Sequence, residues 1–320
     1  MKNRFLIVFI SVMIVCSFIL MKRIERSRTK TTYSIGILQT ASHPALDAAR
    51  DGFIEELQHT MGDDVAFIIQ NAQGSISQMH AIAQQFHANN TLNGFFAIAT
   101  PAAQAMSSVE KERPIFISAV TDPNALGLVY PTTNVCGSKD MIDVNAQIEM
   151  LIQLIPHAKT IGILYTAGET NSITLAKLMH SELRAHGLTP IDFAVTNESD
   201  MAAVTELAFR KSDAVLAPTD NSVASSISLI VSIANKHKKP IIVSDNMSVR
   251  FGALAARGVD YKESGRQTAR IAYAVLVEGK KPYDLPIEQT EAKAIYVNKK
   301  TLDNLGLIIP DAIKNDVVLV

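Results

Sequence analysis

Small polar and charged residues stand directly after most of the apolar runs of this sequence, where a strand would end and a helix begin. The candidate ligand-binding residues come from these positions: Gln39, His43, Thr100, Ala102, Thr121, Asp122, Tyr165, Asn171, Ser172, Asp220, Asn221 and Asp245. In open parallel sheets, ligands bind in the crevice outside the carboxyl ends of the strands. Helix N-termini at such junctions also present free N–H groups, which suit a carboxylate. The pattern therefore predicts a polar ligand site.

Each of these residues also has a purely structural interpretation. Ser, Thr, Asp and Asn are the ordinary N-cap residues of helices, so any one of them could simply begin the next helix. His43, directly before Pro44, could contact a ligand or could cap a helix start. Ligand binding is favoured because nearly every junction is small and polar, which is typical of a cleft lined from two sides.

Sequence motifs for catalysis are absent. The chain has no G-x-x-x-x-G-K-[ST] phosphate loop, no G-x-G-x-x-G after the first apolar run, no G-x-S-x-G and no H-E-x-x-H. Its eight histidines show no metal-ligand spacing. Asp220 and Asp245 could form an acid–base pair, but neither a nucleophile nor a metal ligand accompanies them. We therefore expect no enzymatic activity, no metal and no cofactor.

The elements that would position these residues alternate between strand and helix. Continuous apolar runs separated by amphipathic helices predict parallel sheets that are covered on both faces. The alternation begins again near residue 135 with no linker rich in Gly, Ser or Pro, so two lobes joined by crossing strands are expected. The expected strands are 33–38, 65–70, 94–99, 114–120, 135–137, 160–165, 189–195, 214–217, 240–243 and 252–256, and residues 294–297 are expected to be extended.

Composition excludes several classes of protein. The 320 residues are 48% hydrophobic and 19% charged, which argues against a disordered chain. Thirty basic residues balance 31 acidic ones, without the basic surplus of a nucleic-acid-binding protein. Of the two cysteines, Cys16 lies in the first apolar segment and Cys136 in the expected folded part, so no internal disulfide is expected.

The N-terminus carries a targeting or anchoring signal. Lys2 and Arg4 precede residues 5–21, which contain no charge, and five basic residues follow between 22 and 30. This pattern predicts either a cleaved signal peptide or a retained membrane anchor within residues 1–30. Val15 before Cys16 does not fit a lipoprotein signal. The basic residues after the segment argue against export, because positive flanks favour the cytoplasmic side.

Five blocks of sequence carry a family resemblance. They resemble the ABC-transporter substrate-binding proteins of the tryptophan/aromatic amino acid-binding type, a branch of the type I periplasmic-binding fold, and they lie at residues 43–53, 97–104, 119–123, 218–225 and 252–261. The likeness extends over about residues 33 to 307. It implies an extracytoplasmic or periplasmic binding protein, anchored through residues 5–21 if the segment is retained, that delivers its ligand to an ABC permease and its ATPase.

The resemblance also implies a fold: α/β, with two doubly wound parallel-sheet lobes joined by three crossover segments. We expect the crossings near 121–131, 257–260 and 281–286. The N-terminal lobe would then comprise 31–122 plus 259–283, and the C-terminal lobe 123–258 plus 284–320. Closure of the lobes around the ligand is the motion expected of such proteins.

For an amino-acid ligand, aromatic ones being favoured, the candidates divide by chemistry. Thr100, Asn171 and Ser172 could donate hydrogen bonds to the carboxylate, and Asp220 and Asp245 could pair with the ammonium. The chain has no tryptophan, so an aromatic wall must come from Tyr, Phe or His, for which Tyr165 is the candidate. The alternatives are a membrane-anchored sensory domain or, less well supported, an α/β enzyme.

Overall fold

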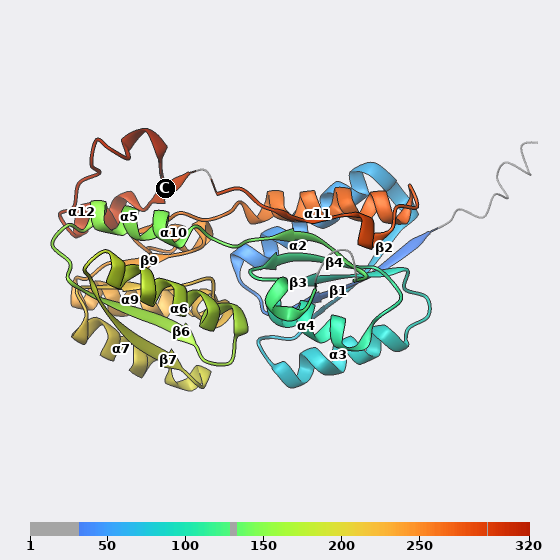
Figure 1. Ribbon diagram of the computed structural model, residues 1–320, viewed down its shortest axis with the longest axis horizontal. Helices are drawn as coiled ribbons and strands as arrows, with labels where there is room; N and C mark the ends of the chain where they lie inside the picture. The colour runs from blue at the N-terminus through green and yellow to red at the C-terminus, as the bar shows by residue number, and fades with distance from the viewer. Residues whose placement is uncertain (1–31, 129–132, 293) are drawn as a thin grey trace, which may run out of the picture.

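Two β-sheets lie side by side, each between layers of helices, in the computed structural model of the chain (Figure 1). The structure describes residues 32–128, 133–292 and 294–320, so the apolar segment 5–21 lies outside the described residues. Among the described residues, no helix is both long enough and apolar enough to cross a membrane. The first sheet is parallel and contains, in spatial order, β11 (Ile287–Gln289), β5 (Val135–Lys139), β4 (Ile115–Val120), β3 (Gly94–Ile98), β1 (Tyr33–Gln39) and β2 (Val65–Asn71).

The second sheet is mixed rather than wholly parallel. Its β12 pairs antiparallel with β10 and parallel with β13. We expected parallel sheets only, because the extended run near residue 295 does not reveal its direction; an antiparallel strand near the edge of such a sheet is common. The spatial order is β13 (Val317–Leu319), β12 (Ile295–Val297), β10 (Ala255–Ala256), β9 (Ile241–Val243), β8 (Ala214–Leu216), β6 (Thr160–Thr166) and β7 (Thr189–Val195).

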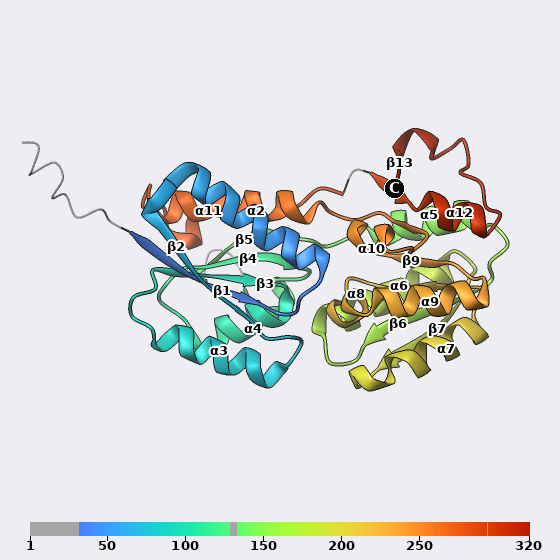
Figure 2. The ribbon, with the colours of Figure 1, turned by 180° about the vertical axis from the view of Figure 1, so that it is seen from behind.

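Helices cover both faces of each sheet, as the uninterrupted apolar strands predicted. On the first lobe, α2 and α11 cover one face and α3 and α4 the other (Figures 1 and 2). Their bounds are α2 (Pro44–Met61), α3 (Ile76–Ala88), α4 (Thr100–Val109) and α11 (Tyr261–Leu276). The second lobe carries α5 (Val144–Leu154), α6 (Thr170–Ala185), α7 (Met201–Lys211), α8 (Asn221–Ser225), α9 (Ile227–His237), α10 (Asn246–Arg250) and α12 (Lys299–Asn304).

Strand β3 shows how one sheet supports two cores. Successive side chains of a strand point to opposite faces. Phe96 therefore packs under α2, where its ring stacks on Phe53 with 3.9 Å between centroids, whereas Phe95 faces α3 and α4. All five residues of β3 are buried, which explains why the run reads as continuously apolar.

Helices α2 and α11 pack in close contact, with glycines at the points where their backbones meet. A Cβ added to Gly52 would collide with the Lys262 carbonyl, and one added to Gly265 would collide with the Ala49 carbonyl. Helix α11 follows β10 of the second sheet in sequence, yet it packs on α2 and so belongs to the first lobe, as the resemblance implied.

A buried carboxylate, Glu110, lies at the C-terminal end of α4 in the first lobe. Glu110 accepts hydrogen bonds from the backbone N–H groups of Glu112 (2.8 Å) and Arg113 (3.0 Å) and from Arg113 Nε (2.9 Å). The Arg113 guanidinium also lies 4.7 Å from the centroid of the Phe95 ring. Burial alone would raise the pKa of Glu110, but these N–H donors and the Arg113 charge outweigh it and lower the pKa to about 2.

The chain passes between the two sheets three times among the described elements: between β5 and α5, between β10 and α11, and between β11 and β12. Strands β5 and β11 both belong to the first sheet, whereas the boundaries expected from sequence, 122/123 and 283/284, placed them in the second lobe. The first and third crossings therefore lie later than expected. Both strands are short, so pairing with a neighbouring strand, and not their own pattern, decides their sheet.

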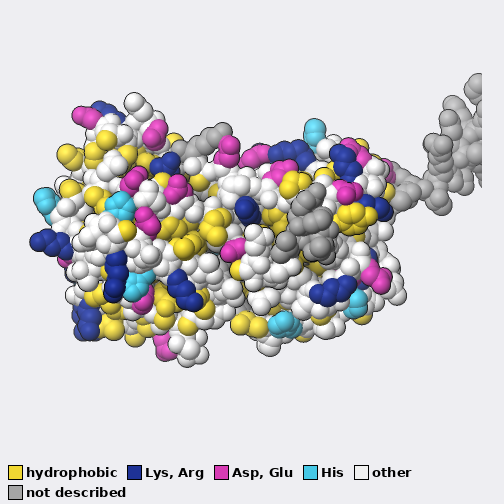
Figure 3. Space-filling view, viewed as in Figure 1, with side chains coloured by type: hydrophobic (Ala, Val, Ile, Leu, Met, Phe, Trp, Pro, Cys, Tyr) yellow, Lys and Arg dark blue, Asp and Glu magenta, His cyan; other side chains and the backbone are white. Residues whose placement is uncertain are grey.

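Charged side chains of both signs are interspersed on the surface. On the face shown in Figure 3, Lys and Arg alternate with Asp and Glu over both lobes. This distribution agrees with the near-zero formal charge of −1. The visible face thus has no basic stripe of the kind that tracks a nucleic-acid backbone.

Candidate ligand-binding site between the two lobes

A small cavity lies where the carboxyl ends of the strands of both sheets meet. Its volume is about 20 Å³, measured as space open to the centre of a water molecule, which is room for about one water. The lobes are therefore closed over it. Its lining residues come from both lobes: His43, Ala45, Leu46, Ala119, Asp140, Asn171, Thr219, Asp220, Asn221, Ala224, Asp245 and Tyr261.

Five of the twelve sequence-predicted residues line this cavity: His43, Asn171, Asp220, Asn221 and Asp245. They come from the loop before α2, the first turn of α6 and the starts of α8 and α10. Helix starts after neighbouring parallel strands converge at one edge of each sheet, and this brings residues about 200 positions apart to a single site. The other seven are not among its lining residues: Gln39, Thr100, Ala102, Thr121, Asp122, Tyr165 and Ser172.

Three of those seven support the strand ends of the first lobe. The Thr100 hydroxyl oxygen accepts a hydrogen bond from the Thr121 N–H (3.3 Å), and the Thr121 hydroxyl donates to Asp140 (3.1 Å). Asp122 accepts a hydrogen bond from the Ala125 N–H (3.1 Å) and so begins a short 3-10 turn. These contacts fit the helix-cap and turn interpretation of small polar residues.

The remaining four also make internal contacts. The Ala102 N–H donates to the Thr40 hydroxyl (3.2 Å), and Ser172 donates to the Thr219 carbonyl (3.3 Å). The Gln39 amide bonds to Asp47 and Arg50 of α2. Tyr165, the expected aromatic wall, is half-buried against the core between the second sheet and α6. Tyr165 faces that core because successive side chains of β6 point to opposite faces of the sheet.

Asp220 and Asp245 act as helix N-caps and line the cavity as well. Asp220 accepts hydrogen bonds from the Val223 N–H (2.8 Å) and from both the N–H (2.6 Å) and the hydroxyl (2.9 Å) of Thr166. Asp245 accepts a hydrogen bond from the Ser248 N–H (2.7 Å). Asp220 thus accepts more hydrogen bonds from the second lobe than Asp245 does.

Asp140 and Tyr261 form a buried pair that the sequence did not single out. The Tyr261 hydroxyl donates to Asp140 at 2.8 Å, and both residues line the cavity. Asp140 follows β5 at the first crossing, and Tyr261 begins α11 after the second, so the pair joins two crossings. Burial raises the pKa of both groups, and the Asp140 carboxylate raises the pKa of Tyr261 further. Placing β5 in the first sheet would have identified Asp140 as a residue at a strand end.

Glu169 is a second buried carboxylate that sequence reasoning missed. It accepts hydrogen bonds from the backbone N–H groups of Asn221 and Ser222 (3.1 Å each), from the Ser222 hydroxyl (3.1 Å) and from the Asn221 side-chain amide (2.5 Å). It thereby caps the start of α8 from the loop before α6. Burial, followed by the nearby charge of Asp220, raises the pKa of Glu169 to about 7.

His43 connects the two lobes. Its Nε2 lies 3.3 Å from the side-chain oxygen of Asn221, across the closed interface. It occupies the N-cap position of α2, but its side chain makes no capping hydrogen bond. Its Nδ1 has no hydrogen-bond partner within the described part of the chain. Burial lowers the pKa of His43, which favours the neutral ring.

Two alanines at strand ends have unusual backbone angles. Ala99 and Ala119 adopt φ values of +78° and +58°, which residues other than glycine rarely adopt. Ala119 lines the cavity at the end of β4. Such conformations cost on the order of 1–3 kcal/mol each and cluster at functional sites, because the surrounding fold must hold them.

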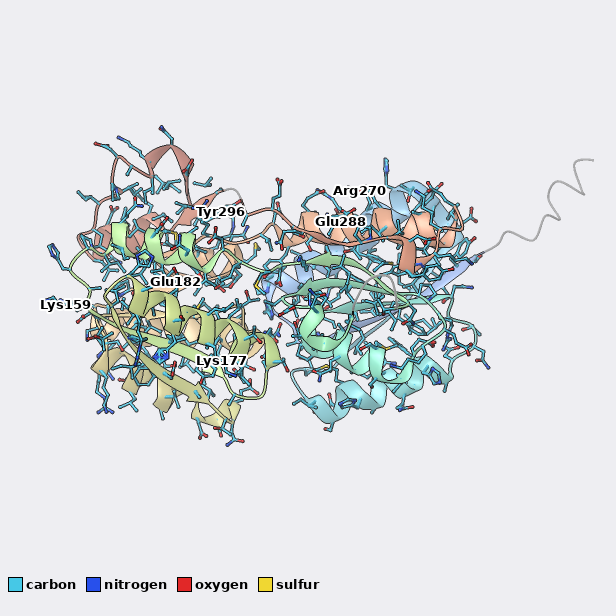
Figure 4. The ribbon with its side chains drawn as sticks, in the orientation of Figure 1. Lys159, Lys177, Glu182, Arg270, Glu288 and Tyr296 are labelled. Carbon is cyan, nitrogen blue, oxygen red and sulfur yellow. The ribbon has the colours of Figure 1, made fainter. Side chains whose placement is uncertain are left out.

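A larger, open groove of about 760 Å³ runs along α11 and β11 beside the second and third crossings. Figure 4 shows Arg270 and Glu288 on its first-lobe side and Tyr296 on the second lobe. Its polar side chains bond to one another: Arg270 pairs with Glu263 at 2.6 Å, and Gln267 donates to Glu288 at 2.5 Å. Arg270, Glu263 and Glu288 of the groove are thus already engaged within the first lobe.

Comparison with known proteins agrees with this geometry. The family model described as "ABC transporter substrate binding protein" matches residues 34–318. A tyrosine-binding protein of Clostridioides difficile is 33% identical over 290 residues, which cover 88% of this chain and 84% of that protein.

Two solved structures resemble the chain to different degrees. A domain from Streptococcus pneumoniae in complex with L-Trp has a TM-score of 0.86 at 33% identity, covering 90% of this chain and 100% of that one. The ligand-free, open structure of a substrate-binding protein from Clostridium difficile has a TM-score of 0.67 at 33% identity, with coverage of 90% and 99%. The chain thus superposes more closely on the L-Trp complex than on the ligand-free, open structure.

Proposed function

Because the chain belongs to the ABC transporter substrate-binding protein family, we propose that it captures an amino acid, with aromatic side chains favoured, in the cavity between its lobes. The observation that supports this most strongly is the closed cavity itself, which is lined by polar residues of both lobes at their strand ends. The printed ligands of the relatives, tyrosine and L-Trp, support the aromatic preference.

Capture would proceed by closure of the lobes. A ligand can shift the balance between open and closed forms only if it binds the closed form more tightly. In the closed form, it would contact the first lobe through His43 and Tyr261 and the second through Asn171 and Asp245. The three crossings allow this motion because each is short, and the Asp140–Tyr261 pair holds two of them together.

An aromatic side chain would need an apolar wall and a ring to pack against. Ala45, Leu46 and Ala224 supply apolar surface in the cavity, and Tyr261 and His43 supply rings. Tyr165, which the sequence suggested, faces the core between the sheet and α6. The closed cavity is too small for an aromatic amino acid, so we propose that its walls move apart to admit one and close around it.

Members of this family work outside the cytoplasm with an ABC transporter, and we propose that this chain delivers its ligand to a dedicated permease and ATPase without chemical turnover. We further propose that residues 5–21 anchor the protein in the membrane. This is supported by the absence of charge in that run, which lies between Lys2 and Arg4 on one side and the basic residues from Lys22 on the other.

Thermal-shift measurements on the purified full-length protein with each of the twenty amino acids test the ligand class. A ligand at 100 times its Kd stabilises the folded state by about 2.7 kcal/mol. We expect the largest shifts from tryptophan, tyrosine or phenylalanine, and mass spectrometry of any co-purifying small molecule provides an independent identification. No shift with any of the twenty would refute the amino-acid assignment, whereas a larger shift with an aliphatic one would refute only the aromatic preference.

A further inference from the structure

We propose that the cavity recognises its ligand by an ammonium group and not by a carboxylate, and that Glu169 is the positioning residue that makes this so. This inference rests on the proposed binding function and specifies which end of the ligand the cavity holds. It follows from the orientation of two side-chain amides, Asn171 and Asn221, and from the effect of one of them on His43.

Glu169 fixes the orientation of both amides. An ionised carboxylate only accepts hydrogen bonds, so the amide group that faces it must present its NH₂. The Asn221 Nδ2 lies 2.5 Å and the Asn171 Nδ2 lies 3.2 Å from Glu169 Oε2. The Asn171 Nδ2 also donates to the Thr219 carbonyl at 2.9 Å, which independently requires the same orientation. Both amides therefore direct their oxygens away from Glu169.

The orientation of Asn221 determines the tautomer of His43. The group 3.3 Å from His43 Nε2 is the Asn221 oxygen, an acceptor, so Nε2 must carry the proton. A neutral imidazole has one protonated nitrogen, and Nδ1 is then a hydrogen-bond acceptor. This Nδ1 is buried and has no partner within the described residues, and His43 lines the cavity.

The second amide leaves another acceptor without a partner. The Asn171 Oδ1 is buried and is not bonded to any described residue, and Asn171 also lines the cavity. Asp140, Asp220 and Asp245 add carboxylates, and the lining set includes neither Lys nor Arg. The Thr219 hydroxyl, which can donate or accept, is also buried without a partner among the described residues and lines the cavity. Buried polar groups normally have hydrogen-bond partners, and acceptors predominate here, so the set calls for a ligand that donates. An ammonium donates three hydrogen bonds and carries the opposite charge, whereas a carboxylate only accepts.

This assignment differs from the sequence-based expectation for one residue. Asn171 was expected to donate to the ligand carboxylate, but its NH₂ already serves Thr219 and Glu169. We assign it instead as an acceptor for the ammonium. A single bound water is the competing explanation of the unpaired acceptors, since the cavity has room for about one.

Truncated ligands distinguish these explanations. Binding to the full-length protein is measured by calorimetry at about pH 8, above the pKa of about 7 for Glu169. The probes are L-tryptophan and L-tyrosine, the amines tryptamine and tyramine, and the acids 3-indolepropionate and 3-(4-hydroxyphenyl)propionate. Loss of the ammonium should weaken binding by about 100-fold or more, because the buried acceptors then stay unpaired. Loss of the carboxylate should weaken it less.

Each outcome decides a different question. If the acids bind within about tenfold of the amino acids, the ammonium assignment is wrong and the single-water explanation stands, while the proposed function survives. If the amines bind and no amino acid does, the inference stands and the amino-acid assignment falls. If none of the probes binds, both are rejected.

The role of Glu169 is tested by Glu169→Gln, with Glu206→Gln as the matched control. Glu206 on α7 pairs with Lys236 and His237 on α9, and it does not line the cavity. A glutamine cannot accept from all the donors around position 169, so the affinity for L-tryptophan should fall on the order of tenfold, the effect of one lost oriented hydrogen bond. The control should bind as the wild type does. Equal affinity of the two variants would remove Glu169 from ligand positioning.

Nitrogen NMR of His43 gives a measurement that a merely structural role of Glu169 would not change. In the wild type saturated with the tightest probe, Nε2 should be protonated and Nδ1 unprotonated, and Glu169→Gln should mix the two tautomers. A protonated Nδ1 in the wild type would overturn the inference. This measurement on the wild type, like the ligand series, stands even if the variant does not fold.

Discussion

Replacing Tyr261 by phenylalanine tests whether the buried Asp140–Tyr261 pair supports the crossings. The substitution removes one hydroxyl and keeps the ring, so packing around α11 should be retained. Asp140 then keeps its 3.1 Å hydrogen bond from Thr121 but loses the 2.8 Å bond from Tyr261. Asp140 is fully buried and Tyr261 only 3% exposed, so bulk solvent does not reach the place of the lost hydroxyl.

The magnitude follows from the charge of the acceptor. Hydrogen bonds to charged groups contribute about 1.5–3 kcal/mol, against about 1 kcal/mol for neutral ones. Burial raises the pKa of Asp140, and the Tyr261 hydrogen bond opposes that rise. Because the pKa of Asp140 is raised in the folded state, this group stabilises the fold fully below its ordinary pKa of 3.8. That stabilisation is lost as the pH rises through the raised pKa. Without Tyr261, the loss should be larger, so the effect of Tyr261→Phe should grow with pH.

Urea unfolding between about pH 4 and pH 8 measures this effect. With an m value of about 3 kcal/mol/M, a loss of about 1.5–3 kcal/mol lowers the midpoint by about 0.5–1 M at the upper pH. The lowering should be smaller at the lower pH. Tyr283→Phe is the matched control, because Tyr283 is 46% exposed and should tolerate the change. A midpoint for Tyr261→Phe that equals the control, or a loss independent of pH, would refute the reasoning.

The remaining predictions concern packing, acid stability, binding and location. Gly265→Ala should lower the free energy of unfolding by about 1–3 kcal/mol in urea titrations, because its Cβ would collide with α2, whereas Gly168→Ala, with open space around it, should have little effect. Glu110→Gln should remove stability that the wild type loses only as the pH falls from 4.5 to about 2; denaturation curves that stay parallel across that range would contradict this. Asp245→Asn should weaken ligand binding by about 2–5 kcal/mol in calorimetry while folding is little changed, since Asn also caps helices; unchanged affinity would leave Asp245 as a cap only. A reporter fused after Val320 should be active only when it functions outside the cytoplasm, and activity of a cytoplasmic reporter there would contradict the uptake role.

Much of the fold could be predicted from the sequence because local patterns are enough to locate most helices and strands. The apolar run of β3 and the Pro44 start of α2 mark their elements by composition alone, and their alternation requires sheets covered on both faces. The family resemblance implied that α11 belongs to the first lobe, which no local signal could show. Strands β5 and β11 were assigned to the wrong lobe because a three- to five-residue strand carries no information about its neighbour.

The candidate site was only partly predictable, for a physical reason. A small polar residue at a strand end has the same sequence signature whether it caps a helix, as Asp122 caps its turn, or lines the cavity, as Asn171 does. Which of these it does depends on residues far away in sequence. His43 meets Asn221 across 178 positions, and Tyr261 meets Asp140 across 121.

Sequence alone therefore determined the class of fold, the family resemblance and the edge of the sheets at which a ligand would bind. Only the tertiary structure decided which side chains converge there and which atoms they present. Asn171 became an acceptor because Glu169 and the Thr219 carbonyl bind its NH₂, and those groups are brought to it by the packing of β6, β8 and α6. The direction of a hydrogen bond depends on the three-dimensional neighbours of a side chain, and these neighbours are set by the fold as a whole.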